Sequence, residues 1–264
     1  MLKADRQMKI LDLLKQESGS LRISELSRRL AVAPVTIRRN IAELARHGMV
    51  LSTRGGVRLL GSGTAYEPVY DAKLGEESTQ KAAIAQAAAA LIPDGATVFL
   101  DGGTTVGAVA KHLVHRHVTV ITNALNVANV LTVSRTCRLI LIGGTFRAAS
   151  RTFLGPKATA AVREMRFDIA CIGTEGFAPD RGTEVPDESD ADFKAAAIGL
   201  AAHVLLLATS SKLGERRLYR FATWPKIHRL VTDAGLPPHS RNEILAQGVS
   251  LTIAGEPNDP AQPI

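Results

Sequence analysis

Features that mark membrane, secreted or metal-binding proteins are scarce in this 264-residue chain. No apolar run approaches the roughly 20 residues that span a bilayer, and the N-terminus lacks the hydrophobic stretch of a signal peptide. The chain has two cysteines, Cys137 and Cys171, and each lies in an apolar, strand-like run. This placement indicates buried side chains rather than a disulfide or a metal site. We therefore expect a cytoplasmic protein with no cofactor and no bound metal.

Negative charge is scarce in residues 1–60, which contain 12 Lys and Arg but 5 Asp and Glu. The remaining residues contain 20 of each kind, so the net charge of +7 belongs to the first 60 residues. A basic segment attached to a neutral body is typical of a nucleic-acid-binding domain, because each neutralised phosphate releases condensed counterions. A basic surface that served only solubility would not explain why the charge coincides with the motif described next.

Two amphipathic segments in the basic region predict a helix-turn-helix. Residues 34–44 place Ile37, Ile41 and Leu44 on one helical face, and their outer edge is polar and basic. A proline at position 34 suits the first turn of a helix, and Gly48 supplies a stop. The shorter helical segment 23–30 lies only three residues upstream. Two helices joined by so tight a turn, the second carrying the cations, favour binding in a DNA groove.

The segments on either side complete a winged helix-turn-helix domain over residues 1–60. An apolar stripe in 5–17 predicts a first helix, and 49–60 reads as two short strands around a Gly-Gly turn, which would form a wing. The stripe comprises Met8, Ile10, Leu11 and Leu14, expected to pack against Leu26, Leu30, Ile37 and Leu44. The predicted DNA-contacting residues are Val35, Thr36, Arg38, Arg39 and Asn40 toward the major groove, and Arg28, Arg54 and Arg58 at phosphates.

A second, larger α/β domain with a mostly parallel sheet is expected over residues 76–255. Residues 61–75 show no sustained periodicity and read as a linker, and the proline-rich tail 256–264 is expected to be disordered. An alanine-rich helix over 80–91 precedes short apolar runs that alternate with helical segments, which is typical of strands buried in a parallel sheet. The expected strands are 97–100, 118–121, 139–142, 169–172, 204–207, 227–231 and 249–253.

Polar residues follow several of these strands, at the edge where parallel sheets bind ligands. In the segment 101–105, Asp-Gly-Gly-Thr-Thr, two glycines allow close backbone approach and a helix start supplies N–H groups for a phosphate. A simple strand-to-helix turn would use the same glycines, so both interpretations stay open. The predicted effector-binding residues are Asp101, Gly102, Gly103, Thr104, Thr105, Thr122, Asn123, Gly143, Gly144, Glu175 and Lys212.

These motifs resemble the DeoR family of bacterial transcription regulators over nearly the whole chain. The Thr-Ile-Arg-Arg of 36–39 matches the family's V-S-x-x-T-I-R-R-D-L pattern, although Ala33 and Asn40 replace its Ser and Asp. The family's D-G-G-T-T, T-N, G-G and S-K-x-G motifs occur at 101–105, 122–123, 143–144 and 211–214. Thr209 stands where the family commonly has Asp. The resemblance implies a sensor domain similar in fold to ribose-phosphate isomerases and CoA transferases, with a sugar phosphate as effector.

We therefore predict a ligand-responsive, DNA-binding transcription regulator that binds its operator as a homo-oligomer, a dimer or a tetramer. Repression of carbohydrate-metabolism genes is implied by the resemblance alone. One alternative is a sugar-phosphate isomerase or transferase that uses Glu175 and carries an appended DNA-binding head; another is an architectural DNA protein. His112, His115 and His117 are interpreted as a helix C-terminus rather than a metal site. The acidic stretch 184–192 is interpreted as a surface loop leading into a helix over 191–202.

Overall fold

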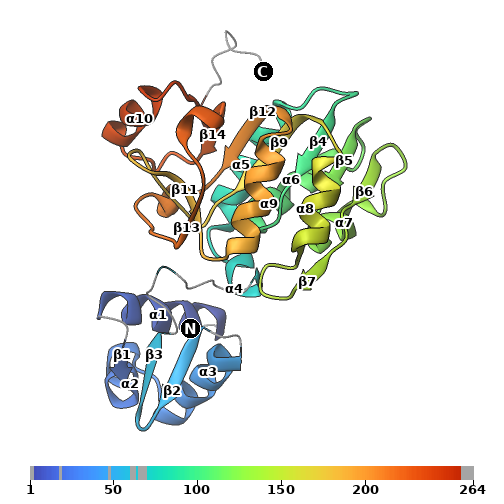
Figure 1. Ribbon diagram of the computed structural model, residues 1–264. Coiled ribbons are helices and arrows are strands. Elements are labelled where there is room, and N and C mark those ends of the chain that lie inside the picture. The colour runs from blue at the N-terminus through green and yellow to red at the C-terminus, as the bar shows by residue number, and fades with distance from the viewer. Residues whose placement is uncertain (1–2, 18–19, 47–48, 60–63, 65–69, 257–264) are drawn as a thin grey trace. The chain divides into compact units, whose positions relative to one another are not determined.

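Two compact units, residues 1–73 and 74–264, make up the chain. A computed structural model describes residues 3–17, 20–46, 49–59, 64 and 70–256 (Figure 1). The predicted tail except Glu256, most of the predicted linker and the proposed helix stop at Gly48 lie outside these residues. The described end of the linker segment forms helix α4 (Tyr70–Leu74). No helix among the described residues is long and apolar enough to cross a membrane.

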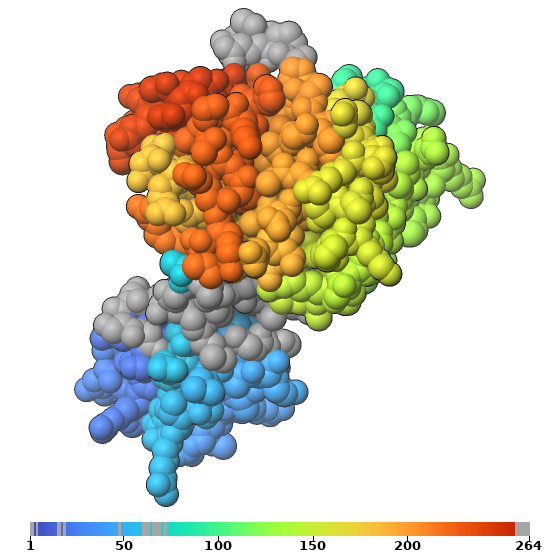
Figure 2. Space-filling view, viewed as in Figure 1, coloured from blue at the N-terminus to red at the C-terminus, as the bar shows by residue number. Residues whose placement is uncertain are grey.

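The N-terminal unit has the winged helix-turn-helix architecture predicted from the sequence. Its helices are α1 (Lys3–Gln16), α2 (Ile23–Leu30) and α3 (Pro34–Arg46). The wing strands β2 (Val50–Thr53) and β3 (Gly56–Leu59) pair antiparallel, and their turn projects from the unit as a narrow tip (Figures 1 and 2). A third strand, β1 (Ser20–Arg22), pairs with β3 and gives the sheet order β1-β3-β2. The sequence analysis missed β1 because three residues are too few to show a period.

The apolar core of the N-terminal unit follows the predicted stripe with one exception. Ile10 and Leu14 of α1 are fully buried, as are Leu26 and Ile37 of the helix-turn-helix. Met8 was expected in this core, but its exposed fraction is 46%. Each helical residue advances about 100° around the axis, so Met8 lies roughly 200° from Ile10 and faces away from the core.

The C-terminal unit is built on a seven-stranded sheet in which every neighbouring pair is parallel. The seven predicted strands are confirmed, with ends that shift by three residues or fewer. Along the sheet they are β15 (Ser250–Ile253), β14 (Arg229–Thr232), β12 (Ala201–Leu207), β9 (Phe167–Gly173), β4 (Thr97–Leu100), β5 (Thr119–Thr122) and β6 (Arg138–Leu141).

Helices cover both faces of this sheet, which explains why its strands are continuous apolar runs. The helices α5 (Ser78–Ala90), α6 (Thr104–Leu113) and α7 (Leu125–Leu131) share one buried cluster with the sheet. The helices α8 (Pro156–Arg163), α9 (Glu188–Ile198) and α10 (Pro238–Leu245) share the other. In the view of Figures 1 and 2, α8 and α9 lie over the near face of the sheet. Successive residues of β12 alternate between the two clusters.

Short strands outside the main sheet escaped the sequence analysis. The hairpin of β7 (Thr145–Arg147) and β8 (Thr152–Leu154) follows β6. A small sheet contains β10 (Gly176–Ala178), β11 (Gly182–Val185) and β13 (Tyr219–Ala222). The helix expected over 191–202 is α9, which ends at Ile198 because β12 begins at Ala201.

Both cysteines are free, but only Cys171 is buried as expected; Cys137 is partly exposed. Burial, with a smaller contribution from the nearby charge of Asp101, raises the pKa of the Cys171 thiol to about 12. Because a thiol with so high a pKa stays protonated at neutral pH, Cys171 is an inert core residue.

Candidate DNA-binding surface and strand-end site

Helix α3 presents a cationic outer face on a buried apolar base. Arg38 and Arg39 are exposed, and neither forms an ion pair with another residue of the described chain. Val35, at the start of the helix, is 69% exposed. The carbonyl of Ala33 accepts the N–H groups of Thr36 (2.9 Å) and Ile37 (3.1 Å), so the helix starts without a side-chain cap. This face can enter a DNA groove without breaking an ion pair of the two arginines.

Asn40 does not belong to that outer face, which corrects its assignment as a DNA contact. Only 2% of its surface is exposed, and its amide nitrogen donates to the carbonyl of Thr36 at 2.6 Å. Its position, three residues after Ile37, places it on the buried side of α3. The resemblance to a family motif placed Asn40 beside the arginines in sequence, but the helical period turns its side chain inward.

The turn between α2 and α3 closes without a glycine. Ala31 takes a left-handed conformation (φ 52°), and its N–H donates to the carbonyl of Arg28. Ser27 adds a hydrogen bond from its hydroxyl to the carbonyl of Val32 at 2.7 Å. The first bond satisfies a C-terminal carbonyl of α2, and the second ties the turn residue Val32 back to α2 before α3 begins.

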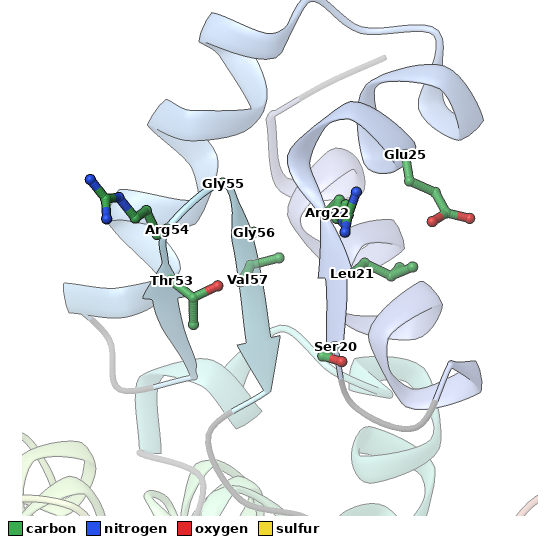
Figure 3. Close-up of a pocket in the computed structure, with 9 residues that line it drawn as sticks. All are labelled: Ser20, Leu21, Arg22, Glu25, Thr53, Arg54, Gly55, Gly56 and Val57. Atoms are coloured by element: carbon green, nitrogen blue, oxygen red, sulfur yellow. The ribbon is translucent and has the colours of Figure 1, made fainter.

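Beside the wing tip lies a groove with arginines on both sides (Figure 3). Arg54 comes from the wing turn and Arg22 from β1, with β3 between them. A Cβ added to Gly56 would lie 2.9 Å from the carbonyl oxygen of Leu21, so only glycine allows this close strand contact. Arg22 was not among the predicted contacts; it is exposed between the buried residues Leu21 and Ile23, and the sequence signalled this only by placing a basic residue between two apolar ones. The groove is lined by Ser20, Leu21, Arg22, Glu25, Thr53, Arg54, Gly55, Gly56 and Val57.

Three further arginines of the unit, Arg28, Arg29 and Arg58, differ in how far nearby carboxylates already compensate their charge. Arg29 lies 2.6 Å from a carboxylate oxygen of Glu25 and 2.8 Å from one of Glu17, and hydrogen bonds to both raise its pKa. Arg28 is 79% exposed and 3.8 Å from Glu25, and Arg58 is exposed on β3. Arg28 and Arg58 are therefore the residues of this group that can accept a new anionic partner.

At the strand ends of the C-terminal unit, a buried ion pair underlies the predicted ligand site. Asp101 is fully buried, and its Oδ2 atom accepts a hydrogen bond from the Lys194 ammonium and another from Gly173 N (2.9 Å). Asp190 lies 3.7 Å from the same ammonium. Burial alone lowers the pKa of Lys194, but the charges of Asp101, Asp190 and Glu175 outweigh it and raise the pKa. Lys194 is therefore a cation at neutral pH.

Lys194 was not predicted, and its partner Asp190 comes from the stretch that the sequence analysis interpreted as a surface loop. That interpretation was wrong for part of the stretch. Glu184 is 2% exposed and belongs to β11, and Asp187 caps α9 by accepting the N–H of Asp190 at 3.0 Å. The spacing of Asp190 and Lys194, one helical turn apart, was a weak signal.

The glycines of segment 101–105 have steric roles within the fold. A Cβ on Gly102 would meet the Cγ2 atom of Thr152 at 2.3 Å, so β8 packs directly on this residue. Gly103 has φ 101° and immediately precedes α6. Thr104 and Thr105 form the first, partly exposed turn of that helix. Because the first N–H groups of a helix have no partner within it, this turn can receive an anion.

Residues 122 and 123, predicted to contact the effector, are fully buried and shape the turn after β5. The Thr122 hydroxyl accepts the N–H of Ala124 at 3.0 Å, and the Asn123 amide donates to the carbonyl of Phe153 at 3.1 Å. Nearby, Asn126 donates to the carbonyl of Gly103 at 3.4 Å. Asn126 therefore ties α7 to the glycine turn, a role that its sequence position did not reveal.

The Gly143–Gly144 pair lies too far along the sheet to share a small ligand with Lys212. It follows β6, whereas Lys212 follows β12, and four strand spacings of about 4.8 Å separate these strands by roughly 19 Å. A Cβ on Gly144 would lie 2.7 Å from the carbonyl oxygen of Leu154. Gly144 therefore allows close packing of the β7–β8 hairpin, and neither glycine belongs to the same site as Lys212.

Lys212 and Glu175 do come together, at the ends of β12 and β9. The lysine ammonium lies 3.3 Å from a Glu175 carboxylate oxygen, and both side chains are partly exposed. The turn that carries Lys212 is fixed by Asp233, whose carboxylate accepts both the N–H and the hydroxyl of Ser210 at 2.7 Å. Among the described residues, no group of three or more His, Cys, Asp and Glu side chains could hold a metal ion.

Comparison with known proteins identifies both units. A model of the DeoR-like helix-turn-helix domain matches residues 6–62, and a model of the DeoR C-terminal sensor domain matches residues 76–234. The chain belongs to the DeoR family. This DeoR-family protein is thus a transcription regulator with a DNA-binding unit and a sensor unit, as predicted.

Two relatives extend over almost the whole of the chain. The glycerol-3-phosphate regulon repressor of Escherichia coli (strain K12) is 33% identical over 93% of this chain and 96% of its own length. The transcriptional repressor GlcR of Bacillus subtilis (strain 168) is 34% identical over 96% and 97%. Ribose 5-phosphate isomerase A of Methanocaldococcus jannaschii shares 16% identity with a TM-score of 0.40, covering 53% of this chain and 56% of its own. That structural likeness is too weak to carry an argument.

Proposed function

We propose that this protein represses carbohydrate-metabolism genes and that a phosphorylated sugar, bound at the strand ends of the sensor unit, controls its affinity for operator DNA. The observation that carries the proposal is that one chain has two cationic sites, one on a helix of the N-terminal unit and one at the strand ends of the sensor unit. Arg38 and Arg39 stand exposed on a packed recognition helix, and Lys212 stands beside the ends of the parallel strands. Two relatives named as repressors, one of a glycerol-3-phosphate regulon, support the assignment.

On the DNA side, α3 would lie in the major groove with Val35, Thr36, Arg38 and Arg39 toward the bases. An arginine there can bind the two acceptor atoms of a guanine edge. Arg28, Arg54 and Arg58 would contact phosphates and fix the orientation of the domain. Helix-turn-helix proteins usually read two half-sites as dimers, so we propose a homo-oligomer on the operator.

On the sensor side, the effector's phosphate would bind between the first turn of α6 and Lys212. The N–H groups of Thr104 and Thr105 and the lysine ammonium supply donors and positive charge. Two strand spacings, roughly 10 Å, separate the ends of β4 and β12. The long side chain of Lys212 would span part of this distance. Glu175 would accept a hydrogen bond from a hydroxyl of the sugar, while the Asp101–Lys194 pair would hold the strand ends beneath it in place.

We propose no catalytic role for these groups. A base that removes a proton from a sugar must itself be unprotonated, and the raised pKa of Lys194 keeps its ammonium charged. The carboxylate of Glu175 is engaged by Lys212. As a DNA-binding regulator, the protein would act in the cytoplasm.

The test is a titration of the purified protein onto DNA from upstream of its own gene, at two salt concentrations, with and without a panel of sugar phosphates. We expect specific, salt-sensitive binding that one sugar phosphate shifts, and no turnover of that compound. Specific binding that no sugar phosphate alters would overturn the sensor assignment. Absence of specific DNA binding, together with isomerisation of a sugar phosphate, would favour the enzyme instead.

A further inference from the structure

A hydrogen bond between residues far apart in sequence connects the Lys212 turn to the first residues of the sensor unit. Thr209, directly after β12, is 2% exposed, and its hydroxyl donates to a carboxylate oxygen of Glu77 at 2.8 Å. The hydroxyl of Ser211 lies 2.9 Å from the same Thr209 oxygen. Glu77 sits between α4 and α5, in the short segment through which the chain enters the sensor unit. Neither Thr209 nor Glu77 has a role in the DNA-binding or effector sites proposed above.

The backbone of Glu77 indicates that its side chain is held in place. The residue has φ 49° and ψ 37°, the left-handed region that residues with a Cβ rarely adopt. A glycine would occupy this position without strain. The Glu77 side chain does not cap the N-terminus of α5. It extends to Thr209 and accepts the hydrogen bond from its hydroxyl. Such a conformation persists only where surrounding contacts fix it.

Two carboxylates, Asp233 and Glu77, therefore hold the Lys212 turn, and they come from different parts of the sensor unit. Asp233 binds Ser210 and follows β14, a strand of the same sheet, so this anchor belongs to the rigid scaffold. Glu77 lies outside the sheet, beside α4. Within the turn, the N–H of Lys212 donates to the carbonyl of Thr209 at 3.0 Å. A displacement of Lys212 thus acts directly on the residue that holds Glu77.

Building on the function proposed above, we propose that Glu77 couples effector binding to the segment that leads to the DNA-binding unit. Lys212 is paired with Glu175, and a phosphate at Lys212 competes with that carboxylate. The same phosphate accepts a hydrogen bond from the exposed Ser211 hydroxyl, which then no longer donates to Thr209. Hydrogen bonds in a chain polarise one another, so the Thr209–Glu77 bond weakens and the strained Glu77 backbone is released.

A double-mutant cycle tests this coupling in the full-length protein. Glu77→Ala removes the acceptor, and Thr209→Val removes the donor while keeping the shape of the buried side chain. Glu76→Ala is the matched control, because it removes a carboxylate from the neighbouring residue. The hydrogen bond of Glu76 to Lys81 uses the backbone carbonyl, which the substitution keeps. For each variant, affinity for operator DNA is measured with and without the sugar phosphate that shifts the wild type, and affinity for that sugar phosphate is measured separately.

We expect the effector to change wild-type operator affinity by about 5- to 150-fold, and to do so in Glu76→Ala as well. In Glu77→Ala and in Thr209→Val, operator affinity without the effector should already match that of the effector-bound wild type, and adding the effector should change it little. Both variants should still bind the sugar phosphate. The double variant should be no worse than either single variant. Amide hydrogen exchange at residues 74–82 should rise when the effector binds the wild type, and should already be fast in Glu77→Ala.

Four results would overturn the coupling. Full effector response in Glu77→Ala, or additive losses in the double variant, would show that the contact transmits nothing. Loss of sugar-phosphate affinity in Glu77→Ala would make Glu77 part of the binding site instead. A wild-type protein whose operator binding no sugar phosphate changes would remove the proposed function itself, a failure that is distinguished because it appears without any substitution.

Discussion

The two units of this regulator treat positive charge in opposite ways. On α3, Arg38 and Arg39 stand in water without a carboxylate partner among the described residues, whereas Lys194 of the sensor unit is buried and paired with Asp101 and Asp190. DNA brings its own dense negative charge, so a cation that meets it can remain solvated until binding. A buried lysine has no water to solvate it and needs its counter-charge within the fold. The comparison distinguishes exposed cations that are available to bind a ligand from buried cations that stabilise the fold.

Removing the buried cation should produce the largest effect. Lys194→Met leaves Asp101 buried without its partner, and we expect the free energy of unfolding to fall by about 3–5 kcal/mol. Urea unfolding of the purified protein measures this change. Lys111→Met, at an exposed position of α6, is the control and should change stability little. Adding Asp101→Asn to Lys194→Met should recover part of the loss; equal losses for the two lysine variants would contradict the assignment of Lys194.

Removing an exposed cation of α3 should act on binding alone. Arg38→Ala or Arg39→Ala should cost about 1–3 kcal/mol of operator affinity for each base contact, with unfolding unchanged. Fluorescence anisotropy with specific and scrambled DNA gives the comparison. Arg46→Ala, at the other end of the same helix and 76% exposed, should have a small effect. Equal losses on specific and scrambled DNA would instead assign the two arginines to phosphates.

Asn40 sharpens the comparison, because it lies on the recognition helix yet belongs to the interior. Asn40→Ala removes its hydrogen bond to the carbonyl of Thr36, and should lower stability by about 1 kcal/mol. The preferred operator sequence should stay the same. Competition binding with singly altered operator sites checks this, and a new base preference in the variant would show that Asn40 reaches the DNA.

The smallest effects should come from cations that contact phosphates. Arg58→Ala should reduce the slope of log affinity against log salt by about 1, and Arg22→Ala should do the same if β1 also meets the backbone. Arg29→Ala serves as the control, because Glu17 and Glu25 already neutralise its charge. Its slope should match that of the wild type; a change as large as that of Arg58→Ala would show that paired arginines also bind DNA.

The sequence predicted those parts of the molecule that show a regular pattern among neighbouring residues. The seven sheet strands are apolar runs, and the helix-turn-helix carries a helical period, so both were found from neighbouring residues. Strands such as β1 and β10 have three residues each and no period. Lys194 and Asp101 are 93 residues apart, and Glu77 and Thr209 are 132 apart. Spacing contains no information about such pairs, which form only when the sheet brings its strand ends together.

The most direct test of the central claim measures operator affinity and sugar-phosphate affinity on the same two variants, Arg38→Ala and Lys212→Ala. The account predicts a double dissociation. Arg38→Ala should lose specific DNA binding and keep its affinity for the sugar phosphate, while Lys212→Ala should keep specific DNA binding and lose that affinity. If Lys212→Ala weakens DNA binding as much as Arg38→Ala does, or binds the sugar phosphate as the wild type does, the division of the two cationic sites is contradicted.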